Sequence, residues 1–358
     1  MSLEPTRAPN EAQSIALTAR KTAVVLLLVG LALLTYALAD VLVLIFGAIL
    51  VAVILRAIGD PISHYTRLPH KVSVLIAVLL IALFIAAASW LVGSRINAQF
   101  SDMWQALPQG WDQIQQRLSG SWLGNQVASS LQEARPDVRD IAARLGVIVA
   151  SIGGVLTDLL LVLFAGLYLA LAPGLFREGL AKLFPKRRED EVKSALDNSG
   201  RALRKWLLAQ LISMTIVGTL TGLGLWLAGV PYPIALGLVS AVMEFIPIVG
   251  PFLAAVPGIL LALLDSTGTA LWAAGVYLAV QQLESDVITP YVINEAVSIP
   301  PALTLMGVLI LGALFGVMGV ILAAPMLVVA IVLTSQLYVR DSLHHDVRIP
   351  GAGKDEDD

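Results

Sequence analysis

The stretch VSVLIAVLLIALFIAAASWLVGS, residues 72–94, establishes the class of structure that this chain forms. It holds 23 residues without one ionisable side chain, and a helix needs about 20 such residues to cross a hydrocarbon core of roughly 30 Å. Its apolar residues form one unbroken run, whereas the strands of a membrane barrel alternate apolar and polar residues. The stretch therefore predicts a transmembrane helix and an all-α fold.

Similar runs flank this stretch on both sides. Residues 22–38, 41–58 and 147–171 are also long and apolar. The whole chain is 57% hydrophobic and 14% charged, with a mean hydropathy of +0.82, whereas an average soluble protein has roughly 25% charged residues. The sequence therefore predicts a polytopic helix bundle embedded in the lipid bilayer.

The basic residues predict which segments face the cytoplasm. Bases precede the first run, lie between the second and the third, and number nine in residues 172–205; such segments stay on the cytoplasmic side of a membrane. Residues 94–146 hold five Arg and five acidic residues and are predicted to lie outside. The predicted order is a cytoplasmic N-terminal segment, 1–21; three spans, 22–93; an external insert, 94–146; a fourth span, 147–171; a cytoplasmic basic segment, 172–205; the C-terminal membrane domain, 206–339; and a cytoplasmic tail, 340–358.

The external insert and the basic segment both carry amphipathic helical patterns. In the insert, apolar residues recur at spacings of three and four, which places them on one helical face. They are Phe100, Trp104, Leu107, Trp111, Ile114 and Leu118. A second stripe follows in residues 127–145, and Pro108 predicts a helix start, so two or three helices are expected. Packing on the protein's own spans, insertion among headgroups and contact with another subunit all fit the insert, and the basic segment is expected at an anionic membrane surface.

Several classes of function are excluded by what the sequence lacks. It contains no cysteine, so thiolate catalysis, disulfides and cysteine-bound metals are ruled out. Its four histidines lack the i, i+4 spacing of a helical zinc site, and no Gly-x-x-x-x-Gly-Lys phosphate loop occurs. No Ser/Lys, His-Glu-x-x-His or paired-aspartate motif of an intramembrane protease lies in a span, and no basic tract of nucleic-acid type occurs. We therefore expect no enzyme, no cofactor, no bound metal and no nucleic-acid partner.

Residues 206–339 carry five acidic residues and no Lys or Arg. A carboxylate near the bilayer centre costs about 2.5–3.5 kcal/mol on insertion scales, so water, a cation, a proton or another helix must compensate it. Glu244 follows several apolar turns and is the strongest candidate for a functional carboxyl group. Glu284 and Asp286 close an apolar run, and Gln281 shares a helical face with Glu284. Gln281 and Glu284 are expected to face a polar path, with solvation at a helix end as the alternative for both acids.

Proline and glycine interrupt the same region in a pattern that recurs once. Pro233 and Pro257 are 24 residues apart, as are Pro301 and Pro325, and the two pairs are offset by 68 residues. We interpret this as a weak internal repeat of two interrupted hairpins, with chance similarity as the alternative. Paired interrupted spans mark the binding site in transporters, because unwound backbone is tolerated only where it is buried or lines a polar cavity. The residues expected to frame such a path are Pro247, Gly250, Pro251, Pro257, Pro290, Pro300, Pro301, Gly316, Gly319 and Pro325.

Two small-residue motifs in this half predict close helix packing. Gly218-x-x-x-Gly222 and Gly312-x-x-x-Gly316 each place two glycines on one helix face, where a neighbouring helix can approach closely. Packing within one subunit and contact between subunits both fit the motifs. A homo-oligomer is the expected assembly.

Three sequence blocks resemble the AI-2E family of bacterial membrane permeases. The blocks are EFIPIVGP at 244–251 with AVP at 255–257, QQLE at 281–284 with Pro290, and FGVMG at 315–319 with Pro325. The resemblance implies about eight spans in a bacterial inner membrane, with both termini in the cytoplasm. It also implies export of autoinducer-2, a quorum-sensing signal, or a similar small polar solute, with some members acting as sodium/proton antiporters. The chain departs from the family pattern at Ser285-Asp286 and Glu295, where Gly-Asn and a nearby base are usual, and the more negative field favours cations.

These features together predict a transport path in the C-terminal half. Glu244, Gln281, Glu284 and Asp286 are predicted to contact a solute or a coupling ion such as H⁺ or Na⁺, and Glu244 to carry a proton. The favoured function is secondary or facilitated export of a small polar organic solute. A Na⁺ or Li⁺/proton antiporter and a non-transporting membrane scaffold are the alternatives.

Overall fold

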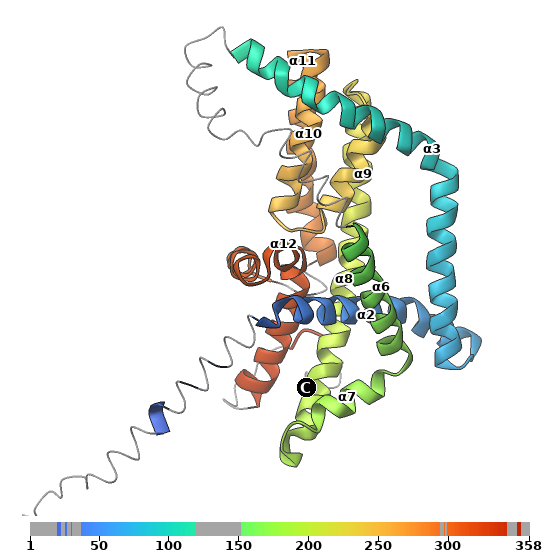
Figure 1. Cartoon of the computed structure of the whole chain (residues 1–358), viewed down its shortest axis with the longest axis vertical. Helices are drawn as coiled ribbons and strands as arrows, with labels where there is room; N and C mark the ends of the chain where they lie inside the picture. Colours follow the sequence, from blue (N-terminus) through green and yellow to red (C-terminus); the bar gives the residue numbers. More distant parts are fainter. Residues whose placement is uncertain are drawn as a thin grey trace, which may run out of the picture.

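The structure, a computed structural model, describes residues 20–22, 26, 30, 37–118, 152–293, 297, 299–341 and 349–351. Nearly all of these residues are helical, and the described part of the chain holds no β-strand (Figure 1). The predicted all-α fold is confirmed. Most of the first predicted span, the second stripe of the insert at 127–145, and Glu295 lie outside the described residues.

The N-terminal half is built from α2 (Ala39–Thr66), α3 (His70–Leu118), α6 (Ile152–Leu171) and α7 (Pro173–Ala181). α2 ends where Arg67 adopts a left-handed conformation with φ of 58°, and the chain turns into α3. α6 and α7 meet at an angle of 86°, because Pro173 disfavours the helical conformation at the residue before it. Small apolar side chains pack α2, α3 and α6 together: Ala52, Leu55, Val74 and Ala170.

α3 joins the third predicted span to the external insert in one helix of 49 residues, which Figure 1 shows bent along its length. Pro108 lies inside this helix, so the prediction that it starts a new helix is wrong. The apolar spacing continues in register through Pro108, and the helix loses one backbone hydrogen bond there instead of ending. Continuous helix therefore crosses the predicted boundary at residues 93 and 94.

The long helix α8 (Glu189–Leu227) follows the short 3-10 turn η1 (Lys186–Arg188) and runs through the middle of the molecule (Figure 1). Its N-terminal part is the basic segment predicted for the cytoplasm, and its C-terminal part is the first apolar run of the C-terminal domain. Leu203, Trp206 and Leu207 of α8 pack in one cluster with Val328 and Val332 from the far end of the chain. α8 is therefore the element on which the C-terminal half is assembled.

Four of the described helices are long and apolar enough to cross a membrane, or five when the bent pair α6 and α7 counts as one span. Two shorter apolar helices, α9 (Pro233–Met243) and α10 (Val249–Asp265), follow α8. α9 has 11 residues and at about 1.5 Å per residue is only roughly 16 Å long, too short to cross a bilayer. The C-terminal half is therefore interrupted, as the sequence predicts.

We call α9, the turn 244–248 and α10 the first hairpin. In its turn Ile248 has a positive φ of 70°, and at Gly250 a Cβ atom would lie 1.8 Å from the Met243 carbonyl oxygen. The close contact between the start of α10 and the end of α9 is possible only with glycine there. The hairpin is followed by α11 (Thr267–Leu283) and by the π-helix η2 (Glu284–Ile293).

The second hairpin is α12 (Pro301–Leu333), which precedes a second π-helical segment, η3 (Thr334–Arg340). Gly316 interrupts α12 with φ of 61° and ψ of −145°, and a Cβ atom at Gly307 would lie 2.4 Å from Leu327. Residues 307 and 327 would be about 30 Å apart in a straight helix. α12 therefore folds back on itself at Gly316 and is a helical hairpin.

The two hairpins correspond at the predicted offset of 68, to within one residue. Pro233 and Pro301 each open the first turn of a hairpin, and the positive φ of Ile248 recurs at Gly316. The Leu311 carbonyl, 68 residues after that of Met243, approaches Gly319, 69 residues after Gly250, with a Cβ at 319 lying 2.0 Å from the oxygen. Shared backbone geometry at equivalent positions supports an internal repeat over chance similarity.

The first small-residue motif packs within the chain, and so does Gly312 of the second, whereas Gly316 breaks the helix and a Cβ there would meet nothing within 4 Å. A Cβ atom at Gly218 would lie 2.9 Å from the Gly237 carbonyl oxygen, and one at Gly222 would lie 3.6 Å from the Gly237 Cα, so α8 and α9 touch along their glycine faces. In the second hairpin, a Cβ at Gly312 would lie 2.8 Å from Val320. Packing within one subunit therefore accounts for these contacts.

Asp60 ties the N-terminal half to α8. Its carboxylate oxygens lie 3.4 Å from His70 Nδ1, 3.5 Å from Arg204 Nη1 and 3.7 Å from Arg56 Nε. Arg204 also donates a hydrogen bond of 3.1 Å to the Ala57 carbonyl oxygen. One carboxylate thus joins α2, the start of α3 and α8.

Asp60→Asn is expected to lower the free energy of unfolding by about 1 kcal/mol, because it removes a charge shared by three bases but only partly shielded from solvent. The melting temperature of the purified protein measures the effect. Asp190→Asn is the control, since Asp190 is 97% exposed and lies 3.6 Å from a single base, Lys193. Equal melting temperatures for the two variants would show that Asp60 does not hold the halves together.

Candidate functional site

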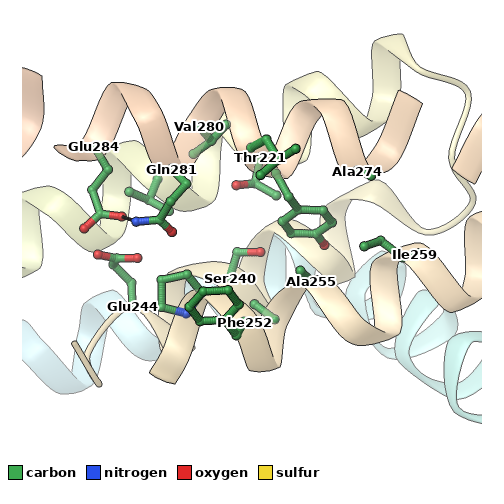
Figure 2. A pocket seen from close by; sticks show the side chains of 15 residues that line it. Thr221, Ser240, Glu244, Phe252, Ala255, Ile259, Ala274, Val280, Gln281 and Glu284 are labelled. Atoms are coloured by element: carbon green, nitrogen blue, oxygen red, sulfur yellow. Dashed lines mark hydrogen bonds between the residues drawn. The ribbon is translucent and has the colours of Figure 1, made fainter. Parts of the chain in front are cut away.

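The turn of the first hairpin places Glu244 at the end of α9, where its side chain is only 5% exposed. Two contacts from α8 hold this turn. Gln210 donates a hydrogen bond of 2.8 Å from Nε2 to the Glu244 carbonyl oxygen. The rings of Trp206 and Phe245 meet edge to face with centroids 6.0 Å apart. The turn between α9 and α10 is therefore anchored to α8, and the Glu244 side chain points toward Glu284 (Figure 2).

Glu284 is the first residue of η2, directly after α11. Gln281 Nε2 donates a hydrogen bond of 2.9 Å to Glu284 Oε2, so the predicted pairing of this amide and this carboxylate on one helical face is confirmed. A change from α to π hydrogen bonding within a helix is frequent at functional sites. Here the change coincides with Glu284.

The carboxyl groups of Glu244 and Glu284 face each other from two different segments (Figure 2). The Glu244 Oε2 atom is buried and has no hydrogen-bond partner among the described residues. No Lys, Arg or His occurs anywhere in residues 206–339. Two ionised carboxylates that face each other repel, so this pair is expected to hold a proton or a cation.

A cavity of about 370 Å³ extends from this carboxyl pair between α8, α9, α10 and α11. Glu244, Gln281 and Glu284 lie at one end of it (Figure 2). The remaining walls are mostly apolar: Val217, Pro251, Phe252, Ala254, Ala255, Ile259, Ala274, Leu278 and Val280. Thr221, Ser240 and Tyr277 add three hydroxyl groups. The cavity thus has an acidic end and a largely apolar body.

Tyr277 is fitted tightly between α10 and α11. A Cβ atom at Gly258 would lie 2.2 Å from the Tyr277 hydroxyl oxygen, so glycine at this position makes room for the phenol. The Tyr277 hydroxyl has no hydrogen-bond partner among the described residues that meets standard geometry. The nearby Ser240 hydroxyl donates to the Leu236 carbonyl oxygen at 3.0 Å. Tyr277 therefore places a buried hydroxyl group beside the cavity.

The structure brings together some of the predicted site residues and separates others. Glu244, Gln281, Glu284 and Pro251 line the cavity. Asp286 does not: it is exposed, and Gln282 Nε2 donates to its carboxylate at 2.5 Å. Pro247 lies in the first turn, Gly250 and Pro257 lie in α10, Pro290 lies in η2, Pro300 and Pro301 open the second hairpin, and Gly316, Gly319 and Pro325 lie within it. The second hairpin contributes no lining residue to this cavity.

Sequence reasoning missed Gln210, Thr221, Ser240 and Tyr277. The available signal was weak: Gln210 and Thr221 are buried polar residues in the mostly apolar C-terminal part of α8. Ser240 precedes Glu244 by one helical turn. Tyr277 precedes Gln281 by one turn as well, so it could have been assigned to the same face of α11.

Gln210→Met is expected to lower the melting temperature, because the buried Glu244 carbonyl then loses its donor. The loss of stability should be about 1–3 kcal/mol, the typical cost of one unsatisfied buried polar group. Gln282→Met is the matched control, since Gln282 is exposed and donates a hydrogen bond to the exposed Asp286. If both variants melt at the same temperature, Gln210 does not anchor the turn.

Comparisons with known proteins agree with this architecture. The sequence profile of the AI-2E family transporters matches residues 23–338. The proposed transport protein YueF of Bacillus subtilis is 30% identical over 298 residues, which cover 78% of this chain and 81% of YueF. The proposed transport protein MT0215 of Mycobacterium tuberculosis is 28% identical over 277 residues, 72% of each chain. The proposed permease PerM of Escherichia coli is 27% identical over 126 residues, 35% of this chain and 36% of PerM. The chain therefore belongs to the AI-2E family of transporters and is a multi-pass membrane protein.

Proposed function

We propose that the protein is a secondary transporter that moves a small organic solute through the cavity between α8 and α11. In this proposal the movement is coupled to protons at Glu244 and Glu284. The observation that carries the proposal is the carboxyl pair itself, with Glu244 buried and Glu284 half-buried at the end of a cavity in a region without any base. Buried acids in a membrane protein are costly, and they commonly mark ion pathways or proton relays.

The coupling follows from charge balance. When the cavity holds no cation, the carboxyl pair needs a proton to limit repulsion between two negative charges. When a solute or an ion supplies positive charge at the pair, that proton can leave. Solute and proton then compete for one site, which is the requirement for exchange of one against the other.

The sequence and the family indicate two candidate transported substrates. An autoinducer-2-like signal is the small polar solute that the family description implies, and a cavity of about 370 Å³ falls in the lower part of the usual range for small-molecule sites, about 300–1,000 Å³. The carboxyl pair favours a second candidate, exchange of Na⁺ or Li⁺ for protons. Location in a bacterial inner membrane, cytoplasmic termini and export as the direction are part of the proposal, supported by the base distribution and the family resemblance. Assembly into a homo-oligomer is also part of it.

Reconstitution of the purified protein in liposomes tests the proposal. A pH-sensitive dye inside the vesicles reports proton movement when Na⁺, Li⁺, a labelled furanosyl signal or labelled small ammonium compounds are added. We expect movement of an organic solute that changes the internal pH. Cation-dependent proton flux without movement of any organic solute would favour the antiporter. Correct insertion without flux of any kind would favour the scaffold.

A further inference from the structure

We propose that the cavity binds a singly charged organic cation, with an ammonium group at Glu244 and Glu284 and an apolar body along α10 and α11. This inference rests on the proposed function in one respect, since it takes the cavity to be the site of the transported solute. It names the charge class of that solute, which neither the family nor the transport function specifies. A neutral furanosyl signal then becomes the competing ligand in the test.

The acidic end of the cavity lacks a positive group. Glu244 is 95% buried, its Oε2 atom has no partner among the described residues, and its carboxyl group points toward Glu284 across the cavity (Figure 2). Gln281 already donates its amide hydrogen to Glu284. An ammonium group beside the two carboxyl groups would supply the missing positive charge, and charge pairs interact strongly where water is largely excluded.

The same end is poorly suited to a divalent metal cation. Ca²⁺ and Mg²⁺ take roughly six or more oxygen ligands, whereas the side chains here offer two carboxyl groups and the amide oxygen of Gln281. Within the described ranges, no group of three or more His, Cys, Asp or Glu residues is placed to hold a metal ion. An ammonium group needs fewer acceptors, because its remaining surface can carry carbon substituents.

The apolar walls fit those substituents. Phe252 and Leu278 line the cavity and are 71% and 72% exposed, so the apolar side of the cavity opens on the outer surface of the chain. In a membrane protein an amphiphilic solute can approach such an opening from the bilayer. Figure 2 shows Phe252 beside the acidic end, where its ring can also attract a cation through its π face.

A neutral, highly hydroxylated solute fits the same walls less well. Most of its hydroxyl groups would face apolar side chains, and burying a hydroxyl without a partner is costly. Thr221, Ser240 and Tyr277 provide three hydroxyl partners, while the carboxyl pair would remain without positive charge. The cavity therefore favours an amphiphilic cation over a furanosyl compound.

Binding to the full-length protein in lipid nanodiscs tests the inference. The probe is radiolabelled benzyltrimethylammonium in equilibrium dialysis, with empty nanodiscs as background. Tetramethylammonium carries the charge without the ring, benzyl alcohol carries the ring without the charge, and ribose represents a neutral furanose. We expect saturable binding of the probe, competition at least about tenfold weaker from tetramethylammonium, and none from benzyl alcohol or ribose, because affinity needs both parts.

Variants separate the two halves of the site. Glu244→Gln and Glu284→Gln should each weaken probe binding about tenfold or more, because a buried charge partner is lost. Asp286→Asn removes the same charge outside the cavity and should leave binding unchanged. Ala255→Trp fills the apolar wall and should weaken binding of benzyltrimethylammonium while sparing that of labelled tetramethylammonium. Melting temperatures close to that of the wild type show that these variants are folded.

Failure of this inference differs from failure of the proposed function. If the probe does not bind saturably, or if Na⁺ or ribose displaces it as well as tetramethylammonium does, the organic-cation class is wrong. Proton-coupled flux that still depends on Glu244 would then leave the transport function standing. If instead the probe binds through Glu244 and Glu284 but no solute or proton crosses the liposome membrane, the cation site stands and transport is wrong.

Discussion

Glu244→Gln and Glu284→Gln should each reduce the solute-dependent proton flux of proteoliposomes by about a hundredfold or more, the usual contribution of a positioned proton-transfer group. Glutamine keeps the volume and the hydrogen-bonding capacity of the side chain but cannot release a proton. The two carboxyl groups face each other and share one environment (Figure 2). The double variant should therefore be little worse than either single variant, because residues that act as a unit are strongly non-additive.

The matched control is Asp286→Asn, which makes the same chemical change two residues from Glu284 on an exposed side chain outside the cavity. We expect its flux to equal that of the wild type. Internal dye fluorescence, corrected for the amount of protein inserted, measures all four proteins. Normal flux in either Gln variant would contradict the assignment of the coupling site. An equal loss of flux in Asp286→Asn would show that removing any carboxyl charge from this segment impairs transport, whether or not it lies in the cavity.

Gly250→Ala and Gly319→Ala should each destabilise the protein by about 3 kcal/mol or more, at the upper end of overpacking effects. In each case the new methyl group would meet a backbone carbonyl oxygen. The methyl at 250 would lie 1.8 Å from the Met243 oxygen, and the methyl at 319 would lie 2.0 Å from the Leu311 oxygen. A backbone oxygen cannot rotate away as a side chain can. The hairpin turn must open instead, and for Gly250 this would displace Glu244.

Gly275→Ala provides the control, since its Cβ atom would meet nothing within 4 Å in α11. Alanine there should leave the melting temperature unchanged or raise it slightly, because glycine inside a helix is less favourable than alanine by roughly 0.5–1 kcal/mol. Thermal unfolding of the purified variants measures the difference. If Gly250→Ala or Gly319→Ala has the same melting temperature as Gly275→Ala, the close backbone contact described for that turn is absent. The equivalence of the two hairpins is then wrong as well.

Local features of the sequence were sufficient for much of the fold. Long apolar runs predict membrane helices because a helix satisfies its own backbone hydrogen bonds in lipid. The two hairpins were predictable because Pro and Gly act on the backbone where they stand, as Ile248 and Gly316 confirm at equivalent positions. Pro108 shows the limit of such local rules, since the helix continues through it.

For the candidate site, too, some features were predictable from local sequence patterns and others depended on tertiary packing. Spacing along one helix was enough to pair Gln281 with Glu284, because residues three apart share a face, and the absence of bases marked Glu244 as an acid in need of compensation. The meeting of Glu244 with Glu284, the exclusion of Asp286 and the inclusion of Tyr277 depend on how α8, α9, α10 and α11 pack. These contacts join segments far apart along the chain, and no local pattern of residues specifies the distance between them.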